Sequence, residues 1–199
     1  QGATPFRLNL HVRDLGHTFM FGPTGAGKST HLALIAAQLR RYKNMSIYCF
    51  DKGMSMYPLT QAVGGKHFCV ASDDDALAFC PLQFLETKGD RAWALEWIST
   101  IIELNNITIT PAQRNEISNA ITSMHKSGAR TLSEFVVTIQ DEAIRDVLAQ
   151  YTIDGMMGHL LDADHDGLSL SSFTTFEIEE LMNLGQTYAL PTPLYLFRR

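Results

Sequence analysis

Apolar residues recur with the period of a helix in some segments of the chain and as short strand-like runs in others. Over residues 15–42, a hydrophobic stretch passes through glycines into apolar positions that share one helix face. Those positions are Leu32, Ile35, Ala36 and Leu39. This order predicts a strand, a loop and a helix over residues 28–42.

Two further short runs, at residues 44–51 and 64–71, are typical of strands. Both contain β-branched or aromatic residues and are bounded by Asn, Asp or Gly. Strands that alternate with helices indicate a mainly parallel sheet with helices on both faces. We therefore expect an α/β fold.

After about residue 86, helical periods follow one another without a strand between them. Asp90 is a candidate cap for a helix that carries Trp93 and Trp97 in its core-facing stripe. The sequences TPAQ at 110–113 and TLSE at 131–134 have the form of capping boxes. A further helix is expected to bury Ile144, Val147, Leu148 and Tyr151.

These patterns divide the chain into three predicted regions. Residues 1–86 are expected to form the first part of an α/β core, and residues 87–160 an all-helical insertion. Residues 161–199 would return to the core near LSLSSFTTFEI, at positions 168–178. The sequence begins with Gln1, and we expect it to be a piece of a longer protein.

The stretch FGPTGAGKST, at residues 21–30, fits the phosphate-loop pattern G-x-x-x-x-G-K-[ST]. Glycines let backbone N–H groups curl round a phosphate chain, and a helix N-terminus favours an anion. Lys28 would reach the β and γ phosphates, Ser29 would hold Mg²⁺ through its hydroxyl, and Thr30 would lie near the α phosphate. The predicted nucleotide-binding residues are Gly22, Pro23, Thr24, Gly25, Ala26, Gly27, Lys28, Ser29 and Thr30, with ATP and Mg²⁺ as the expected ligands.

Hydrolysis of a nucleoside triphosphate also needs an acidic residue on a neighbouring strand. Asp51 ends the hydrophobic run SIYCFD and is a candidate for the acid on the metal side. Lys52 follows it, however, where an adjacent catalytic Glu is expected. An Asp that ends a strand and begins a turn is the other interpretation, and the sequence leaves both open.

Composition excludes several classes of protein. The chain has 199 residues and a net charge of −5, so it has no overall basic field for nucleic acid. Its three cysteines lack C-x-x-C spacing, which argues against a zinc site or a secreted disulfide framework and favours a reducing cytoplasm. No apolar run is long enough to cross a membrane.

The stretch DADHDGLSLSSF, at residues 162–173, imitates the start of a calcium loop. Asp162, Asp164, Asp166 and Gly167 match its first positions, but Phe173 stands where a bidentate carboxylate is required. A turn that leads into a strand is the preferred interpretation, and a calcium module is the last of the alternatives.

Beyond these motifs, the chain resembles the TrbE-type conjugal transfer ATPases of type IV secretion systems. The similarity covers nearly the whole chain, and its motifs occur in the order of the family. They are PFRLNLHVRDLGHTFMFGPTGAGKST, IYCFDKG, GGKHF, RTLSEF and PLYLFRR.

The resemblance implies a RecA-like phosphate-loop core with an all-helical insertion. It also implies ATP hydrolysis that powers pilus assembly and substrate transfer. Homo-oligomers, with a hexamer as one candidate size, would lie at the cytoplasmic face of the bacterial inner membrane beside other secretion subunits. The alternatives are a DNA-translocating RecA-like motor and a small phosphotransferase that uses Asp51.

Two departures from the family pattern shape our expectations. Cys80 and Pro81 stand where similar proteins usually carry Asn-Pro. The Asp-Glu strand of the family would be expected shortly beyond Arg199, and no arginine finger is identifiable. We therefore predict nucleotide binding with little turnover, together with an unpaired sheet edge that favours association or partial disorder near residues 165–199.

Overall fold

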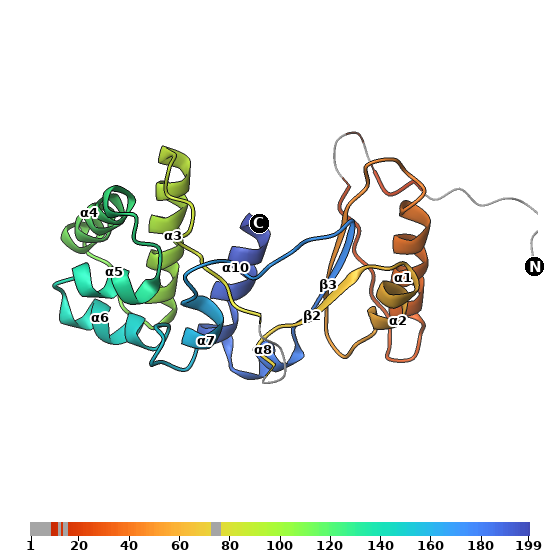
Figure 1. Cartoon of the computed structure of the whole chain (residues 1–199). Helices are drawn as coiled ribbons and strands as arrows, with labels where there is room; N and C mark the ends of the chain where they lie inside the picture. The colour runs from red at the N-terminus through yellow and green to blue at the C-terminus, as the bar shows by residue number, and fades with distance from the viewer. Residues whose placement is uncertain (1–8, 12, 14–15, 73–76) are drawn as a thin grey trace, which may run out of the picture. The chain divides into compact units, whose positions relative to one another are not determined.

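The computed structural model describes residues 9–11, 13, 16–72 and 77–199 of the chain. Residues 1–45 and 46–199 form two compact units. The first unit contains one helix among its described residues, and the second contains a parallel sheet and the remaining helices (Figure 1).

In the first unit, helix α1 spans Lys28–Leu39, so it ends three residues before the predicted boundary. Ala36 is buried on its apolar face, whereas Leu32 is exposed. The strand predicted before the loop is absent from residues 16–21, and residue 15 lies outside the described residues. A strand needs the backbone of a second extended segment, and the described residues of this unit offer none.

The sheet of the second unit consists of three parallel strands among the described residues, which confirms the predicted α/β fold. Strands β1 (Ile47–Asp51), β2 (Lys66–Cys69) and β3 (Phe173–Glu177) lie in the order β1-β3-β2. The late strand β3 is therefore the central one. Among the described residues, the unpaired edges of the sheet lie on β1 and β2, because β3 is paired on both sides. Association or partial disorder near residues 165–199 stays a prediction.

Both faces of this sheet carry helices, as predicted. On one face, the rings of Phe50 and Phe68 stack on Phe176 of the central strand, and Phe197 of α10 (Pro191–Arg198) packs against Phe50. On the other face, Thr60 of α2 (Tyr57–Ala62) shares a 2.7 Å hydrogen bond with Thr175. These contacts fix the two helices on opposite sides of β3.

Helices α3 to α7 follow one another between β2 and β3 and gather on one side of the sheet (Figure 1). Their bounds are Lys88–Leu104, Pro111–Ser127, Leu132–Thr138, Glu142–Ala149 and Gly158–Leu161. After β3, α8 (Glu179–Asn183) and α9 (Gln186–Ala189) lead into α10. The domain boundaries at residues 86 and 160 stay predictions.

Reciprocal capping boxes begin α3, α4 and α5. The boxes predicted at Thr110 and Thr131 are confirmed, with Gln113 and Glu134 as their third helical residues. The prediction that Asp90 is the N-terminal cap of α3 was wrong. Thr87 is the cap and Asp90 closes the box from the third position, because a carboxylate there can accept the backbone N–H of Thr87.

The main core lies among these helices. Ile144, Val147, Leu148 and Tyr151 are buried, as the sequence predicted. Trp97 is also buried and donates its indole N–H to the carbonyl oxygen of Pro191 at 2.9 Å, which attaches α3 to the start of α10. One cluster of buried hydrophobic side chains includes residues of these helices and Phe176 of β3, so the helical segment and the sheet share one core.

Candidate functional site

The predicted phosphate loop is a compact turn that leads directly into α1. Gly25 and Gly27 both have a backbone φ of 82°, in the left-handed region that glycine adopts without strain. A Cβ atom at either position would meet no other atom within 4 Å, so backbone conformation rather than crowding requires glycine there. Gly25 and Gly27 therefore have the backbone conformation that favours glycine, and nucleotide binding by the loop stays a prediction.

Among the described residues, no side chain caps the first backbone N–H groups of α1. Gly27 precedes the helix with no side-chain cap, and no acidic residue lies in the first turn. Unpaired N–H groups and the helix dipole stabilise an anion by about 0.3 to 1 kcal/mol at an exposed helix end. This end of the helix can therefore receive a phosphate group.

Lys28 places its ammonium group across the loop. Its Nζ atom donates hydrogen bonds to the carbonyl oxygens of Gly22 and Pro23, each at 2.8 Å. These bonds hold the cation beside the same loop whose N–H groups would contact a phosphate. Ser29 and Thr30 follow on the first turn of α1, so the residues of the motif lie together.

A hollow of about 500 Å³ adjoins the loop within the first unit. Its lining combines Lys28 and Thr30 with Phe21, His31 and Leu34. Cationic and hydroxyl groups therefore lie beside an aromatic and aliphatic wall. Such a surface suits a ligand that has both phosphate and ring parts.

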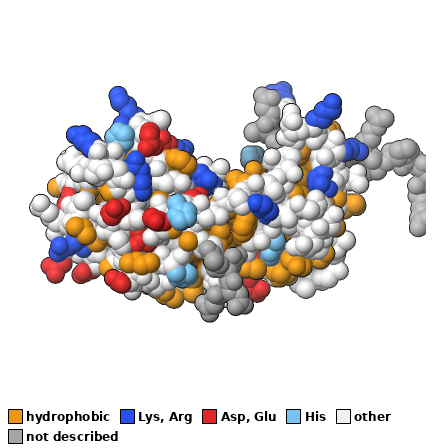
Figure 2. All heavy atoms as spheres, in the orientation of Figure 1, with side chains coloured by type: hydrophobic (Ala, Val, Ile, Leu, Met, Phe, Trp, Pro, Cys, Tyr) orange, Lys and Arg blue, Asp and Glu red, His pale blue; other side chains and the backbone are white. Residues whose placement is uncertain are grey.

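The two units differ strongly in charge. Six of the 16 Lys and Arg residues but only one of the 21 Asp and Glu residues lie within residues 1–45. The acidic excess of the chain is therefore confined to residues 46–199, where acidic and basic side chains are mixed on the visible face of α3 to α7 (Figure 2). A basic unit around the phosphate loop favours anionic ligands, although the net charge of the whole chain is negative.

Asp51 lies at the carboxyl end of β1, where its carboxylate is buried and each of its oxygens accepts a hydrogen bond. One oxygen accepts the hydroxyl of Ser55 at 2.6 Å, and the other accepts the N–H of Met56 at 2.7 Å. This geometry favours the turn interpretation, because both oxygens stabilise the loop after β1. A role for Asp51 in binding metal stays a prediction.

Glu177 is a second buried carboxylate at this edge, and sequence reasoning missed it. It ends β3 and is paired in register with Asp51. Its oxygens accept the N–H groups of Gly53 at 3.1 Å and of Met54 at 2.6 Å. The polar threonines in FTTFE, at residues 173–177, make this strand less hydrophobic than the run that ends at Asp51. Like that run, FTTFE ends in an acidic residue, and this shared feature could have identified Glu177.

The calcium-like segment forms a loop that leads into β3, as preferred. Asp162 accepts the N–H groups of Ser133 at 2.9 Å and Ile153 at 2.7 Å. Asp166 accepts the hydroxyl of Tyr195 at 2.6 Å. Among the described residues, no group of three or more His, Cys, Asp or Glu could hold a metal ion. These carboxylates therefore stabilise the fold.

Cys80, the first departure from the family pattern, is buried and donates its thiol to the carbonyl oxygen of Arg130 at 3.4 Å. Burial, together with the negative charges of Asp166 and Asp164, raises the pKa of this thiol to about 12. The thiol of Cys80, a weak hydrogen-bond donor, therefore stands where similar proteins usually carry the side-chain amide of an Asn.

We expect Cys80 to resist alkylation in the folded chain. At pH 8, iodoacetamide should modify it at least about 100-fold more slowly than an unfolded cysteine, because so little thiolate is present. Mass spectrometry of the labelled peptides measures this rate. Equal rates for Cys80 in the native chain and in guanidinium chloride would contradict the buried, protonated thiol.

Sequence comparison finds relatives along the whole chain, although no protein-family model matches it. The chain is 56% identical to a probable conjugal transfer protein TrbE of Sinorhizobium fredii and covers 30% of that protein. It is 54% identical to the conjugal transfer protein TrbE of Rhizobium radiobacter, of which it covers 25%. All of the chain is aligned in both comparisons.

More distant relatives carry the name VirB4. The type IV secretion system protein VirB4 of Bartonella quintana is 27% identical over the whole chain, which spans 26% of it. Among solved structures, VirB4 of Thermoanaerobacter pseudethanolicus has the same fold, with a TM-score of 0.70 and 12% identity. The match covers 88% of this chain and 52% of that one.

None of the described helices is both long and apolar enough to span a membrane. The chain is therefore similar along its whole length to TrbE proteins and shares its fold with a VirB4 protein, and it spans 25 to 30% of the TrbE proteins that it matches.

Proposed function

We propose that this chain is the nucleotide-binding part of an ATPase that powers conjugal transfer through a type IV secretion system. The observation that carries the proposal is the phosphate loop. Two left-handed glycines lead into an uncapped helix start, and Lys28 lies across the loop. The similarity to TrbE and VirB4 proteins supports the assignment to conjugal transfer and secretion.

In this proposal, residues Gly22 to Thr30 bind Mg-ATP. The loop N–H groups and the N-terminus of α1 contact phosphate oxygens, and Lys28 exchanges its two carbonyl partners for the β and γ phosphates. Ser29 contributes its hydroxyl to Mg²⁺, which neutralises phosphate charge. The chain itself binds nucleotide with little turnover, because both oxygens of Asp51 already serve the loop after β1.

The wider role belongs to the longer protein. The chain spans 25 to 30% of its TrbE relatives, and we assign the full ATPase cycle to the longer protein. We propose that the longer protein forms homo-oligomers, with a hexamer as one candidate size. It would act at the cytoplasmic face of the inner membrane beside other secretion subunits.

Replacing Lys28 by Ala tests the proposal. Wild-type chain should bind Mg-ATP, and the Lys28→Ala variant should bind it at least about tenfold more weakly, a loss of about 1.4 kcal/mol. Isothermal titration calorimetry measures both affinities. Lys43→Ala is the matched control, since it removes an exposed cation from the same unit beyond the end of α1. Equal losses in the two variants would refute a specific role for Lys28.

A DNA-translocating motor is the second candidate, and the concentration of positive charge in residues 1–45 favours it. Such a motor should bind duplex DNA with an affinity that falls steeply as salt rises. Fluorescence anisotropy at 50 and at 200 mM salt distinguishes the two candidates. If no DNA binding is measurable at the lower salt concentration, the DNA-translocating motor is excluded and the secretion ATPase is favoured.

A further inference from the structure

The hollow beside the phosphate loop continues along α1 beyond the residues of the motif. Its lining includes Lys28 and Thr30 from the motif, and then His31 and Leu34 from the following part of the helix. Phe21, which precedes the loop, also lines it. All of these residues lie within the first unit. The hollow therefore joins the start of the helix to a surface outside the motif.

The order of these residues along α1 matches the order of the parts of a nucleotide. The inference rests on the function proposed above, in which Lys28 binds the β and γ phosphates and Thr30 lies near the α phosphate. His31 follows Thr30 directly, and Leu34 lies about 9 Å beyond Lys28 along the helix axis. The ribose and base, which are attached to the α phosphate, would therefore lie against His31 and Leu34.

The imidazole of His31 is available to a ligand. The backbone N–H of His31 donates to the carbonyl oxygen of Gly27 at 2.9 Å, so this residue belongs to the regular first turn of α1. Its side chain is exposed, and in the part of the chain that the structure describes it forms no side-chain hydrogen bond, ion pair or ring contact. The helix thus presents a planar, polar ring to the hollow.

The groups along the hollow differ in chemistry. At the start of α1, Lys28 and Thr30 supply an ammonium and a hydroxyl group. Farther along, Leu34 and Phe21 are apolar and are 56% and 82% exposed, so their surface is open to a ligand. His31 is the one polar side chain described in this second part. Stacking is therefore the main contact that this part offers to a base, and every base has a face that can stack.

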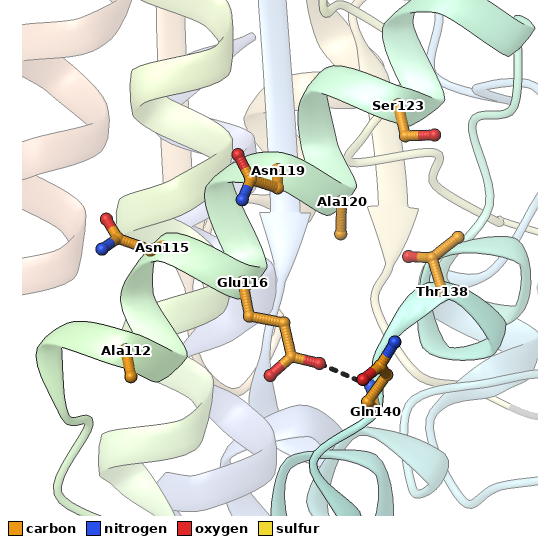
Figure 3. Close-up of a pocket in the computed structure, with 8 residues that line it drawn as sticks. All are labelled: Ala112, Asn115, Glu116, Asn119, Ala120, Ser123, Thr138 and Gln140. Atoms are coloured by element: carbon orange, nitrogen blue, oxygen red, sulfur yellow. Dashed lines mark hydrogen bonds between the residues drawn. The ribbon is translucent and has the colours of Figure 1, made fainter.

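The larger groove of the second unit, between α4 and the segment that follows α5, offers no comparable convergence of groups. Glu116 of α4 accepts the backbone N–H of Gln140 there, which joins the two sides of the groove. The amides of Asn115 and Asn119 are directed away from Gln140 (Figure 3). That groove is a contact between elements of the helical part, and the hollow at α1 is the stronger candidate for a ligand.

We propose that His31 stacks on the base of the bound nucleotide and that the site accepts ATP and GTP alike. Phe21 and Leu34 supply apolar surface beside the base and ribose. Lys28 and the N-terminus of α1 bind the phosphates, which ATP and GTP share. The substrate class is then the purine nucleoside triphosphates, with His31 as the residue that contacts the base.

Isothermal titration calorimetry with Mg-ATP, Mg-GTP and Mg-tripolyphosphate tests the proposal. Tripolyphosphate has the phosphate chain without the nucleoside, so a residue that contacts only the base does not affect its binding. The wild-type affinities for ATP and GTP should agree within about threefold, because stacking tolerates either base. His31→Ala should weaken ATP binding by at least about fivefold and leave tripolyphosphate binding unchanged. His31→Phe should keep most of the affinity for ATP, because it keeps an aromatic face.

His17→Ala is the matched control. His17 is an exposed histidine of the same unit and is absent from the described lining of the hollow. This variant should bind all three ligands like wild type. Melting temperatures equal to that of wild type establish that the variants are folded.

The outcomes distinguish this inference from the proposed function. If wild type binds neither ATP nor tripolyphosphate, both fail. If tripolyphosphate binding requires Lys28 but His31→Ala binds ATP like wild type, the phosphate site stands and this inference is overturned. Three other results would also overturn it: equal losses of ATP and tripolyphosphate affinity in His31→Ala, equal losses of ATP affinity in His31→Ala and His31→Phe, or a preference of more than about tenfold for one base.

Discussion

Replacement of Asp166 by Ala is expected to lower the free energy of unfolding by about 3 kcal/mol, because it removes a buried charge with several partners. The side chain of Asp166 is 3% exposed. Its Oδ2 atom accepts hydrogen bonds from the hydroxyl of Tyr195 at 2.6 Å and the amide of Gln83 at 3.0 Å, and it forms an ion pair with Arg199 at 2.9 Å. The substitution would leave all three donors without this acceptor.

The neighbour Asp164 supplies the control for this experiment. Its side chain is 84% exposed. Among the described residues, the ring of His165, which is also exposed, is its one side-chain hydrogen-bond partner. Asp164→Ala should therefore change stability by less than about 1 kcal/mol. Urea denaturation followed by tryptophan fluorescence measures both variants. Similar losses for the two substitutions would show that the Asp166 cluster does not hold α10 in place.

Tyr195 donates its hydroxyl to Asp166 in the same cluster. Burial, with the hydrogen bond and the negative charge of Asp166, raises the pKa of the Tyr195 phenol above its usual range. Its hydroxyl therefore stays protonated and continues to donate as the pH rises. The cluster depends on the charge of Asp166 rather than on ionisation of Tyr195.

Local features of this fold could be predicted from the sequence. The capping boxes at Thr110 and Thr131 were predicted correctly, because each involves residues only three positions apart. The strands that became β1 and β2 were predicted from short runs of β-branched and aromatic residues. The phosphate-loop motif is local in the same sense, and Gly25 and Gly27 have left-handed backbone conformations that favour glycine.

Features that depend on distant pairing could not be predicted in this way. The position of β3 at the centre of the sheet follows from its pairing with β1 and β2, which precede it by more than 100 residues. The missing strand before the phosphate loop has the same cause. Residues 16–21 have a strand-like composition, but a strand forms only when another backbone pairs with it. Composition alone cannot supply that partner.

At the carboxyl edge of the sheet, one of the two buried carboxylates could be predicted from the sequence and the other could not. Asp51 was recognised because it directly ends an apolar run, whereas Glu177 contacts a loop 124 residues earlier in the chain. That loop includes Met54, whose backbone φ of 60° lies in the left-handed region and costs about 1 kcal/mol for a residue with a side chain. The N–H donated to Glu177 compensates for this strain, so the loop and the carboxylate depend on each other.

Glu177→Ala is therefore expected to lower the free energy of unfolding by about 3 kcal/mol. The change would leave three N–H groups without their acceptor, those of Gly53, Met54 and Glu179. Glu177→Gln should lose less, because one carboxamide oxygen can still accept, and Glu180→Ala, at an exposed neighbour, should lose under about 1 kcal/mol. Hydrogen exchange at Gly53 and Met54 provides the local measurement. If both amides stay fully protected in Glu177→Ala, the loop is held by Asp51 alone and the carboxylate of β3 has no role in its conformation.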